Sequence, residues 1–182
     1  MRKTALIFIV IFSFLNACGQ KNENFNEFIG KFIDFNLPLN PTFFFVSLTG
    51  NNKIKKITQK EYNDYLRTKA DTFWKYNNQF DYCFGGRKKF ENFWLLFYRR
   101  DFLPDDLEKE VGEIKLLTID FTGKIISDIT ISGGYGDSIT IHSKINSFDN
   151  IEINYTKYSN NNGETNYIKR YSIQKDGHFK LK

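Results

Sequence analysis

The chain has 182 residues and carries 26 Lys and Arg against 21 Asp and Glu, a formal net charge of +5. This mildly basic balance does not argue for a nucleic-acid partner, and none is expected. Phe, Tyr and Trp make up 18% of the residues, so aromatic side chains are expected to form much of the core.

The first residues have the pattern of a secretory signal. Arg2 and Lys3 precede an apolar run from Ala5 to Phe12, which is too short to span a bilayer. The run leads into Leu15-Asn16-Ala17-Cys18, which resembles the lipobox of bacterial lipoproteins. An ordinary signal peptide and an amino-terminal transmembrane anchor are the alternatives.

The lipobox resemblance implies cleavage before Cys18 and attachment of lipid to that cysteine. The protein is then held on a membrane through the acyl chains on Cys18, because each buried methylene contributes about 0.8 kcal/mol. The residue after the cysteine is Gly19 and not Asp, which is compatible with sorting of the lipoprotein to the outer membrane of the cell envelope. The periplasmic face and the cell surface both stay open.

Cleavage divides the chain into three expected parts: a lipoprotein signal peptide at 1–17, a lipidated tether at 18–26 and a single domain at 27–182. The roughly 165 residues that remain suit one domain with its own core. Once Cys18 is acylated, Cys83 is the only thiol, so no disulfide can form within the chain. The apolar neighbours of Cys83 indicate a buried structural thiol.

The first elements of the domain are predicted from apolar spacing. Apolar residues recur with the period of a helix from Phe25 and predict an amphipathic helix to about Phe35, after which Pro38 and Pro41 prevent its continuation. The apolar run 43–48 then predicts a strand that is buried on both faces.

A second helix is predicted from a capping box. Thr58 can cap the helix, Glu61 can reach back to it, and Ile57 can pack against Tyr62. We expect this helix to run to about Lys69.

The next segment predicts a hairpin. Two aromatic-rich stretches, 79–84 and 90–98, flank a turn expected at 85–88 because Gly85 and Gly86 suit positive φ. The acidic segment 101–112 is expected to be a solvated loop.

From residue 114 onward, apolar and polar residues alternate between turn signals. This predicts an α+β fold: an antiparallel β-meander, as a curled sheet or an incomplete barrel, with one or two helices packed on it. The predicted strands are 114–121, 124–131, 138–142, 151–158, 166–174 and 179–181.

The segments 116–131 and 171–179 resemble the carboxy-terminal half of small uncharacterised lipoproteins of Bacteroidetes-type bacteria. This resemblance implies a lipidated, mostly β domain outside the cytoplasm, and it implies no catalytic residue.

Residues with catalytic chemistry are few and scattered. His142 and His178 lie far apart, with no further ligand at metal-binding spacing. Ser138, His142 and Asp137 could assemble a catalytic triad, but no nucleophile elbow surrounds the serine. We therefore expect no catalytic residue.

Other candidate ligand sites also lack their defining patterns. The acidic segment has no calcium-loop spacing, and 133–136 lacks the Lys and Ser or Thr of a phosphate-binding loop. No metal site and no cofactor are expected. Exposed aromatic residues, of which Tyr135, Trp74 and Tyr158 are the candidates, would bind sugar rings if they formed a flat platform.

These observations favour a noncatalytic binding or structural module that is anchored to a membrane and engages a protein or an envelope polymer. The alternative is a carbohydrate-binding accessory domain, or an enzyme that acts on envelope or extracellular polymers. An open sheet face with exposed aromatic rings would favour the alternative, and a closed core without a polar cleft would count against it.

Overall fold

A computed structural model describes residues 24–68, 71, 79–102, 111–135, 139–159 and 163–182. The predicted signal peptide and most of the predicted tether lie outside this part of the chain. Two compact units are present, one up to Lys31 and one from Phe32 to Lys182. In the first unit, residues 24–30 form a helix, so the predicted helix ends about five residues early, at Gly30. No helix in the described ranges has the length and apolarity of a membrane-spanning segment.

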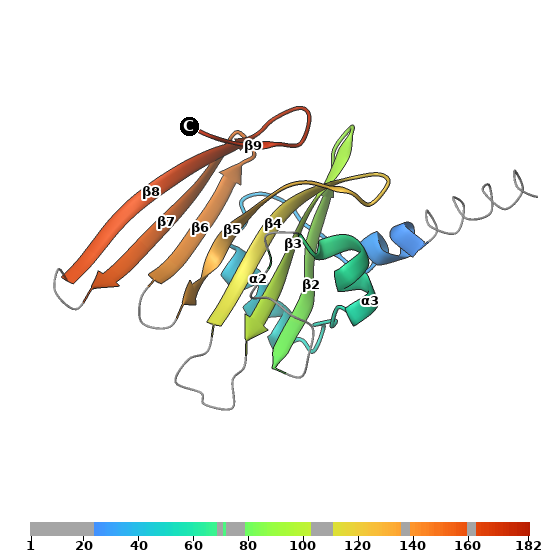
Figure 1. The fold of residues 1–182 in the computed structure, drawn as a ribbon, viewed down its shortest axis with the longest axis horizontal. Coiled ribbons are helices and arrows are strands. Elements are labelled where there is room, and N and C mark those ends of the chain that lie inside the picture. Colours follow the sequence, from blue (N-terminus) through green and yellow to red (C-terminus); the bar gives the residue numbers. More distant parts are fainter. Residues whose placement is uncertain (1–23, 69–70, 72–78, 103–110, 136–138, 160–162) are drawn as a thin grey trace, which may run out of the picture. The chain divides into compact units, whose positions relative to one another are not determined.

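The second unit is built on a nine-stranded sheet whose strands follow one another in chain order (Figure 1). All pairings are antiparallel except that of β1 with β2. Within the described residues the order is linear, so the sheet is open. The strands are β1 (Ile33–Asp34), β2 (Phe80–Lys89), β3 (Phe93–Phe102), β4 (Val111–Asp120), β5 (Ile125–Tyr135), β6 (Ile139–Ser147), β7 (Asn150–Ser159), β8 (Gly163–Ile173) and β9 (Phe179–Leu181).

The predicted antiparallel meander is confirmed. The six strands predicted from residue 114 onward correspond to β4 to β9, and all of them except β9 are longer than expected. Local turn chemistry accounts for this agreement. Between β4 and β5, for example, the Asp120 carboxylate accepts hydrogen bonds from the backbone N–H groups of Thr122 (2.8 Å) and Lys124 (2.9 Å).

The prediction of a turn at 85–88 is wrong. β2 continues through Gly85 and Gly86 to Lys89, and the chain reverses at 90–92 instead. The pairing of β2 with β3 shifts register between Phe84 and Arg87, which marks a β-bulge. A Cβ on Gly85 would lie 2.4 Å from the carbonyl oxygen of Phe97. These glycines therefore permit close packing within the sheet rather than a turn.

The prediction of a strand at 43–48 is also wrong, because these residues belong to helix α2 (Pro41–Gly50). Asn40 caps the helix: its side-chain Oδ1 accepts a hydrogen bond from the N–H of Phe43 (3.0 Å). Pro41 occupies the first turn, where its missing N–H costs nothing. The same proline that was expected to stop a helix therefore starts one.

The predicted capping box is present. The Thr58 hydroxyl accepts from the N–H of Glu61 (3.3 Å), and the Glu61 carboxylate accepts from the N–H of Thr58 (2.8 Å). The helix begins as α3 (Gln59–Glu61), continues as a π-helical turn, η1 (Tyr62–Leu66), and ends at Leu66 instead of Lys69.

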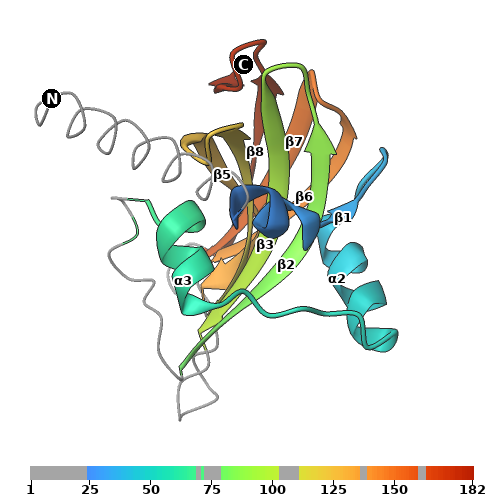
Figure 2. The ribbon, with the colours of Figure 1, turned by 90° about the vertical axis from the view of Figure 1, so that its right-hand side faces the viewer.

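Strands β2 to β4 are covered on both faces. On one face, the Phe97 ring of β3 meets the ring of Phe45 of α2 edge-on, with centroids 5.8 Å apart. On the opposite face, the ring of Tyr82 of β2 lies 4.3 Å from that of Tyr62 of η1. Figure 2 shows α2 and α3 on either side of these strands. Burial on both faces explains why β3 is a nearly continuous apolar run.

The sheet curves around the α2 face. Buried residues from β3 and from β7, such as Leu95 and Ile153, belong to one hydrophobic cluster with Phe45 of α2. Strands that are four apart in the sheet share this cluster because the sheet bends around it. The predicted curled sheet thus fits this unit, whereas the prediction of one or two helices packed on it fits only approximately, since α2 covers one face and the short α3 and η1 lie on the other.

Within the described residues, the long strands β5 and β6 are paired only at Gly133↔Ile141 and Gly134↔Thr140. Gly133 has φ +145, and a Cβ there would lie 2.2 Å from the carbonyl oxygen of Gly112. Only glycine permits this approach. Gly133 and Gly134 lie within β5, which continues beyond the predicted strand end at residue 131.

Candidate binding site

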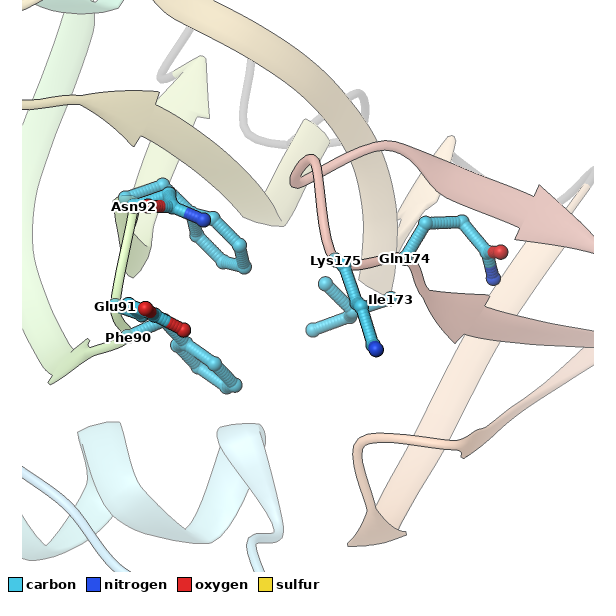
Figure 3. A pocket seen from close by; sticks show the side chains of 7 residues that line it. Phe90, Glu91, Asn92, Ile173, Gln174 and Lys175 are labelled. Atoms are coloured by element: carbon cyan, nitrogen blue, oxygen red, sulfur yellow. The ribbon is translucent and has the colours of Figure 1, made fainter.

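A pocket of about 290 Å³ opens between two hairpin turns of the sheet (Figure 3). One wall is the turn between β2 and β3, and the other is the end of β8 with the turn that follows it. Figure 3 shows the two sets of side chains facing each other across the opening. The lining residues are Phe90, Glu91, Asn92, Phe93, Ile173, Gln174 and Lys175.

Aromatic stacking shapes the first wall. Phe90 and Phe93 lie on either side of the turn, and their rings stack with centroids 4.8 Å apart. The N–H of Phe90 donates to the carbonyl oxygen of Phe93 (2.9 Å), which closes the turn. Phe90 also meets the Phe148 ring edge-on at 5.1 Å. The rings are therefore held in place before any ligand arrives.

Hydrogen bonds hold the second wall. The N–H of Gln174 donates to the carbonyl oxygen of His178 (2.9 Å), and the Gln174 side chain donates to the Ser172 hydroxyl (2.8 Å). The turn is also tied to β4, because the buried hydroxyl of Thr118 donates to the carbonyl oxygen of Gly177 (2.7 Å). A Cβ on Gly177 would lie 3.2 Å from the ring of Phe93, so glycine lets the two walls meet.

The pocket combines an apolar floor with a polar rim. Phe90, Phe93 and Ile173 supply the apolar surface, while Glu91 and Lys175 stand exposed on opposite walls. Neither charge forms an ion pair with a described residue. An apolar pocket with a few polar groups is typical of small-molecule sites. This arrangement can bind a small molecule with an apolar body and polar ends.

A second polar cluster is buried on the face of the sheet opposite α2. Arg100 lies between two carboxylates: its Nη1 is 2.7 Å from Asp71 Oδ1, and its Nε and Nη2 are each 2.7 Å from Glu113 Oε2. All three side chains are nearly inaccessible to solvent. Burial on its own raises the pKa of Asp71, but the hydrogen bond and charge of Arg100, together with the hydrogen bonds from Thr68, outweigh it and the pKa falls below its ordinary value. The cluster is closed to ligands and stabilises the fold.

A third feature lies where the inner face of the sheet opens at β7 and β8. The rings of Tyr155 and Tyr167, which are opposite each other in register, stack in parallel with centroids 4.8 Å apart. The Lys169 amine lies 5.3 Å from the Tyr155 centroid. Burial, followed by the nearby Tyr171 and Tyr167, raises the pKa of Tyr155 to about 12. The two rings cover one another, so they do not form a flat platform.

The two histidines are far from one another in the sheet. His142 is exposed on β6, and His178 is exposed in the turn before β9. Among the described residues, no three His, Cys, Asp or Glu side chains are arranged to hold a metal ion. Tyr158 is exposed on β7, on the face opposite the Tyr155 ring.

Several predicted candidates lie outside the described residues. They are the lipidation site Cys18, Trp74, the acidic residues at 103–110, and Asp137 and Ser138 of the considered triad. The side chain of Tyr135 is also not described. Cys83 is described and is buried, as expected, and burial raises the pKa of its thiol.

The pocket was missed in the sequence because its walls come from turns more than 80 residues apart. One local signal was available: the polar pair Glu91-Asn92 between Phe90 and Phe93 suits a tight turn. Gly85-Gly86 is a stronger turn signal than Glu91-Asn92, so the turn was predicted at 85–88 instead of at 90–92.

Comparison of the chain with protein-family models, curated proteins and solved structures finds no match.

Proposed function

We propose that this chain is a lipid-anchored, noncatalytic binding module of the cell envelope, held at the outer membrane through Cys18. The attachment is supported by the signal-like segment 1–17 and by the lipobox pattern Leu15-Asn16-Ala17-Cys18. The binding role is carried by the pocket between the two turns, with its apolar floor and with Glu91 and Lys175 exposed at the rim.

The attachment is tested by metabolic labelling with an alkyne analogue of palmitate. The native chain is expected to take up label and to fractionate with membranes, and Cys18→Ala is expected to lose both properties. Cys83→Ala is the matched control, because that thiol is buried and should not be lipidated. Label that survives in Cys18→Ala, or label in neither form, would refute lipidation at this residue.

The binding role is tested by screening a library of small amphipathic molecules with ligand-observed NMR. Hits are expected to bind the native protein and to be lost in Ile173→Trp, because the larger ring fills the pocket. Ile168→Trp is the control, since Ile168 is exposed on the outer face of β8. Hits that bind both variants equally would place the site elsewhere.

A carbohydrate-binding accessory domain, or an enzyme acting on envelope or extracellular polymers, is the second candidate. One observation favours it: Tyr167, which is 41% exposed, stands beside Lys169 at the open end of the inner face. Affinity electrophoresis in gels containing envelope polysaccharides tests this candidate. Retardation that is lost in Tyr167→Ala but kept in Tyr158→Ala would favour it, because Tyr158 is similarly exposed on the opposite face.

A further inference from the structure

Helix α2 has an apolar face that is open to solvent. The helix contains no charged residue, and Pro41, Phe45 and Leu48 are its buried residues. On the other side, Phe43 is 69% exposed and Val46 is 60% exposed. A surface helix normally turns polar or charged residues to water. In α2, two large apolar side chains are instead exposed among small uncharged residues.

The chain around this helix is free of negative charge. Residues 35–60 contain no Asp or Glu and four Lys. Lys56 and Lys60 pair with Asp81 and Asp64, respectively. The other two, Lys53 and Lys55, are exposed and form no ion pair with a described residue.

The two exposed lysines follow α2 closely. The N–H of Lys53 donates to the carbonyl oxygen of Leu48 (2.9 Å), so Lys53 lies at the carboxy-terminal end of the helix. Two exposed positive charges thus follow the carboxy-terminal end of α2, and contact of this segment with an anionic surface requires no carboxylate of residues 35–60 to be buried.

We propose that the exposed face of α2 rests on the surface of an anionic lipid bilayer. Phe43 and Val46 enter the boundary between headgroups and acyl chains, and Lys53 and Lys55 contact lipid phosphates. Apolar side chains bordered by lysines are the usual means by which a protein surface binds anionic membranes. Two side chains are too few for a stable protein interface, which needs about 800 Å² from each partner.

The biological setting of this contact rests on the proposed lipid anchor. From Cys18 to Phe32 the chain can span at most about 50 Å, and less because residues 24–30 are helical. The sheet unit therefore stays near the membrane at a high effective concentration, where a small contact is sufficient. The contact then orients the unit on the membrane.

The test uses the mature chain with a histidine tag in place of residues 1–18, bound to vesicles that contain a nickel-chelating lipid. An environment-sensitive nitrobenzoxadiazole label is attached at Val46→Cys, with Cys83 protected by its burial. The matched control carries the label at Ile168→Cys, which is 49% exposed on the outer face of β8. Circular dichroism and thermal unfolding confirm that both variants are folded.

On vesicles of phosphatidylcholine with phosphatidylglycerol, the emission at Val46→Cys is expected to shift to the blue and to be quenched by a doxyl-labelled lipid, while Ile168→Cys stays unchanged. With the tether kept, Phe43→Ser in the labelled Val46→Cys variant is expected to weaken the contact roughly tenfold and to reduce the blue shift, because half or more of a Phe side chain leaves an apolar environment. Lys53→Glu with Lys55→Glu is expected to weaken binding to the anionic vesicles only.

No change at Val46→Cys on tethered vesicles would overturn the proposal, as would an equal change at both labelled positions. Equal binding to vesicles with and without phosphatidylglycerol would overturn the assignment to anionic lipid. Because the tag replaces the lipid, these outcomes do not depend on lipidation. Whether Cys18 is lipidated is tested separately by the palmitate labelling.

Discussion

Replacing Arg100 with Met tests the buried ion cluster on the sheet. In the native protein, Arg100 lies 2.7 Å from carboxylate oxygens of Asp71 and Glu113, and all three side chains are almost fully buried. Met fills much of the volume of Arg but carries no charge and donates no hydrogen bond. The variant therefore leaves two carboxylates in a buried site without their shared partner.

The expected loss is large for a single substitution. Removing one partner of a buried ion pair costs about 3–5 kcal/mol, because the remaining charge is left uncompensated. Here one substitution orphans two carboxylates, so we expect the upper part of this range at neutral pH. Since a domain is stable by only about 5–15 kcal/mol, the variant should lose about a quarter or more of its free energy of unfolding.

The loss should depend on pH in a direction that follows from Asp71. In the native protein its pKa lies below the ordinary value of 3.8, so its ionised form contributes stability above that value, which is lost as the pH falls through the lower folded pKa. Without Arg100, burial still raises the pKa of Asp71 and only the hydrogen bonds from Thr68 still lower it, so this pKa should be higher in the variant than in the native protein. The penalty is then complete at neutral pH and shrinks as acid protonates the carboxyl group.

Urea unfolding followed by circular dichroism at a series of pH values measures both effects. Arg100→Met with Asp71→Asn and Glu113→Gln should recover a large part of the lost stability at neutral pH, since no unpaired charge remains. A loss under about 1 kcal/mol, or a loss that is the same at pH 7 and at pH 4, would show that the reasoning about uncompensated charge is wrong.

Three further predictions concern single positions. Gly133→Ala should lower the free energy of unfolding by about 1–3 kcal/mol, because the position has φ +145 and its Cβ would meet the Gly112 carbonyl oxygen. Gly134→Ala should lower it less in the same urea titration, because the nearest atom to its Cβ would be the Ile139 carbonyl oxygen at 3.6 Å. Asn40→Ala should cost about 1 kcal/mol through loss of the α2 cap, and an unchanged melting temperature would contradict this. Cys83 should react with iodoacetamide only as fast as the protein unfolds, because burial shields the thiol and raises its pKa. Mass spectrometry measures the alkylation, and fast alkylation of the native protein would disprove this prediction.

The meander could be predicted because its information is local. In β4 to β9, one side of each strand joins the shared core and the turns are built from nearby residues. The β4–β5 turn is closed by Asp120 with residues two and four positions away. Signals that act over so few residues can be read from a single sequence.

Two elements were predicted incorrectly, one because its apolar pattern was ambiguous and the other because the deciding contact is with a residue on a neighbouring strand. The apolar run 43–48 fits a buried strand or a buried helix equally well, and the Asn40 cap with Pro41 in the first turn decides for the helix. At Gly85 and Gly86 the reason for glycine is the backbone and ring of Phe97, a residue on the neighbouring strand. Composition alone does not distinguish a glycine needed for close packing from one needed for a turn.

The position of the pocket follows from the contacts that the two ends of strand β5 make with neighbouring strands and turns. β5 and β6 pair only near Gly133 and Gly134, so the strands separate over the rest of their length. At the other end of β5, the N–H of Phe179 donates to the Ser127 hydroxyl (3.4 Å), and Thr118 binds the Gly177 carbonyl. The turn after β8 is thereby drawn toward the turn after β2, and the pocket lies between them. Because rigid strands and buried hydrogen bonds set both walls, the pocket is formed before a ligand binds, which limits the entropy that binding must overcome.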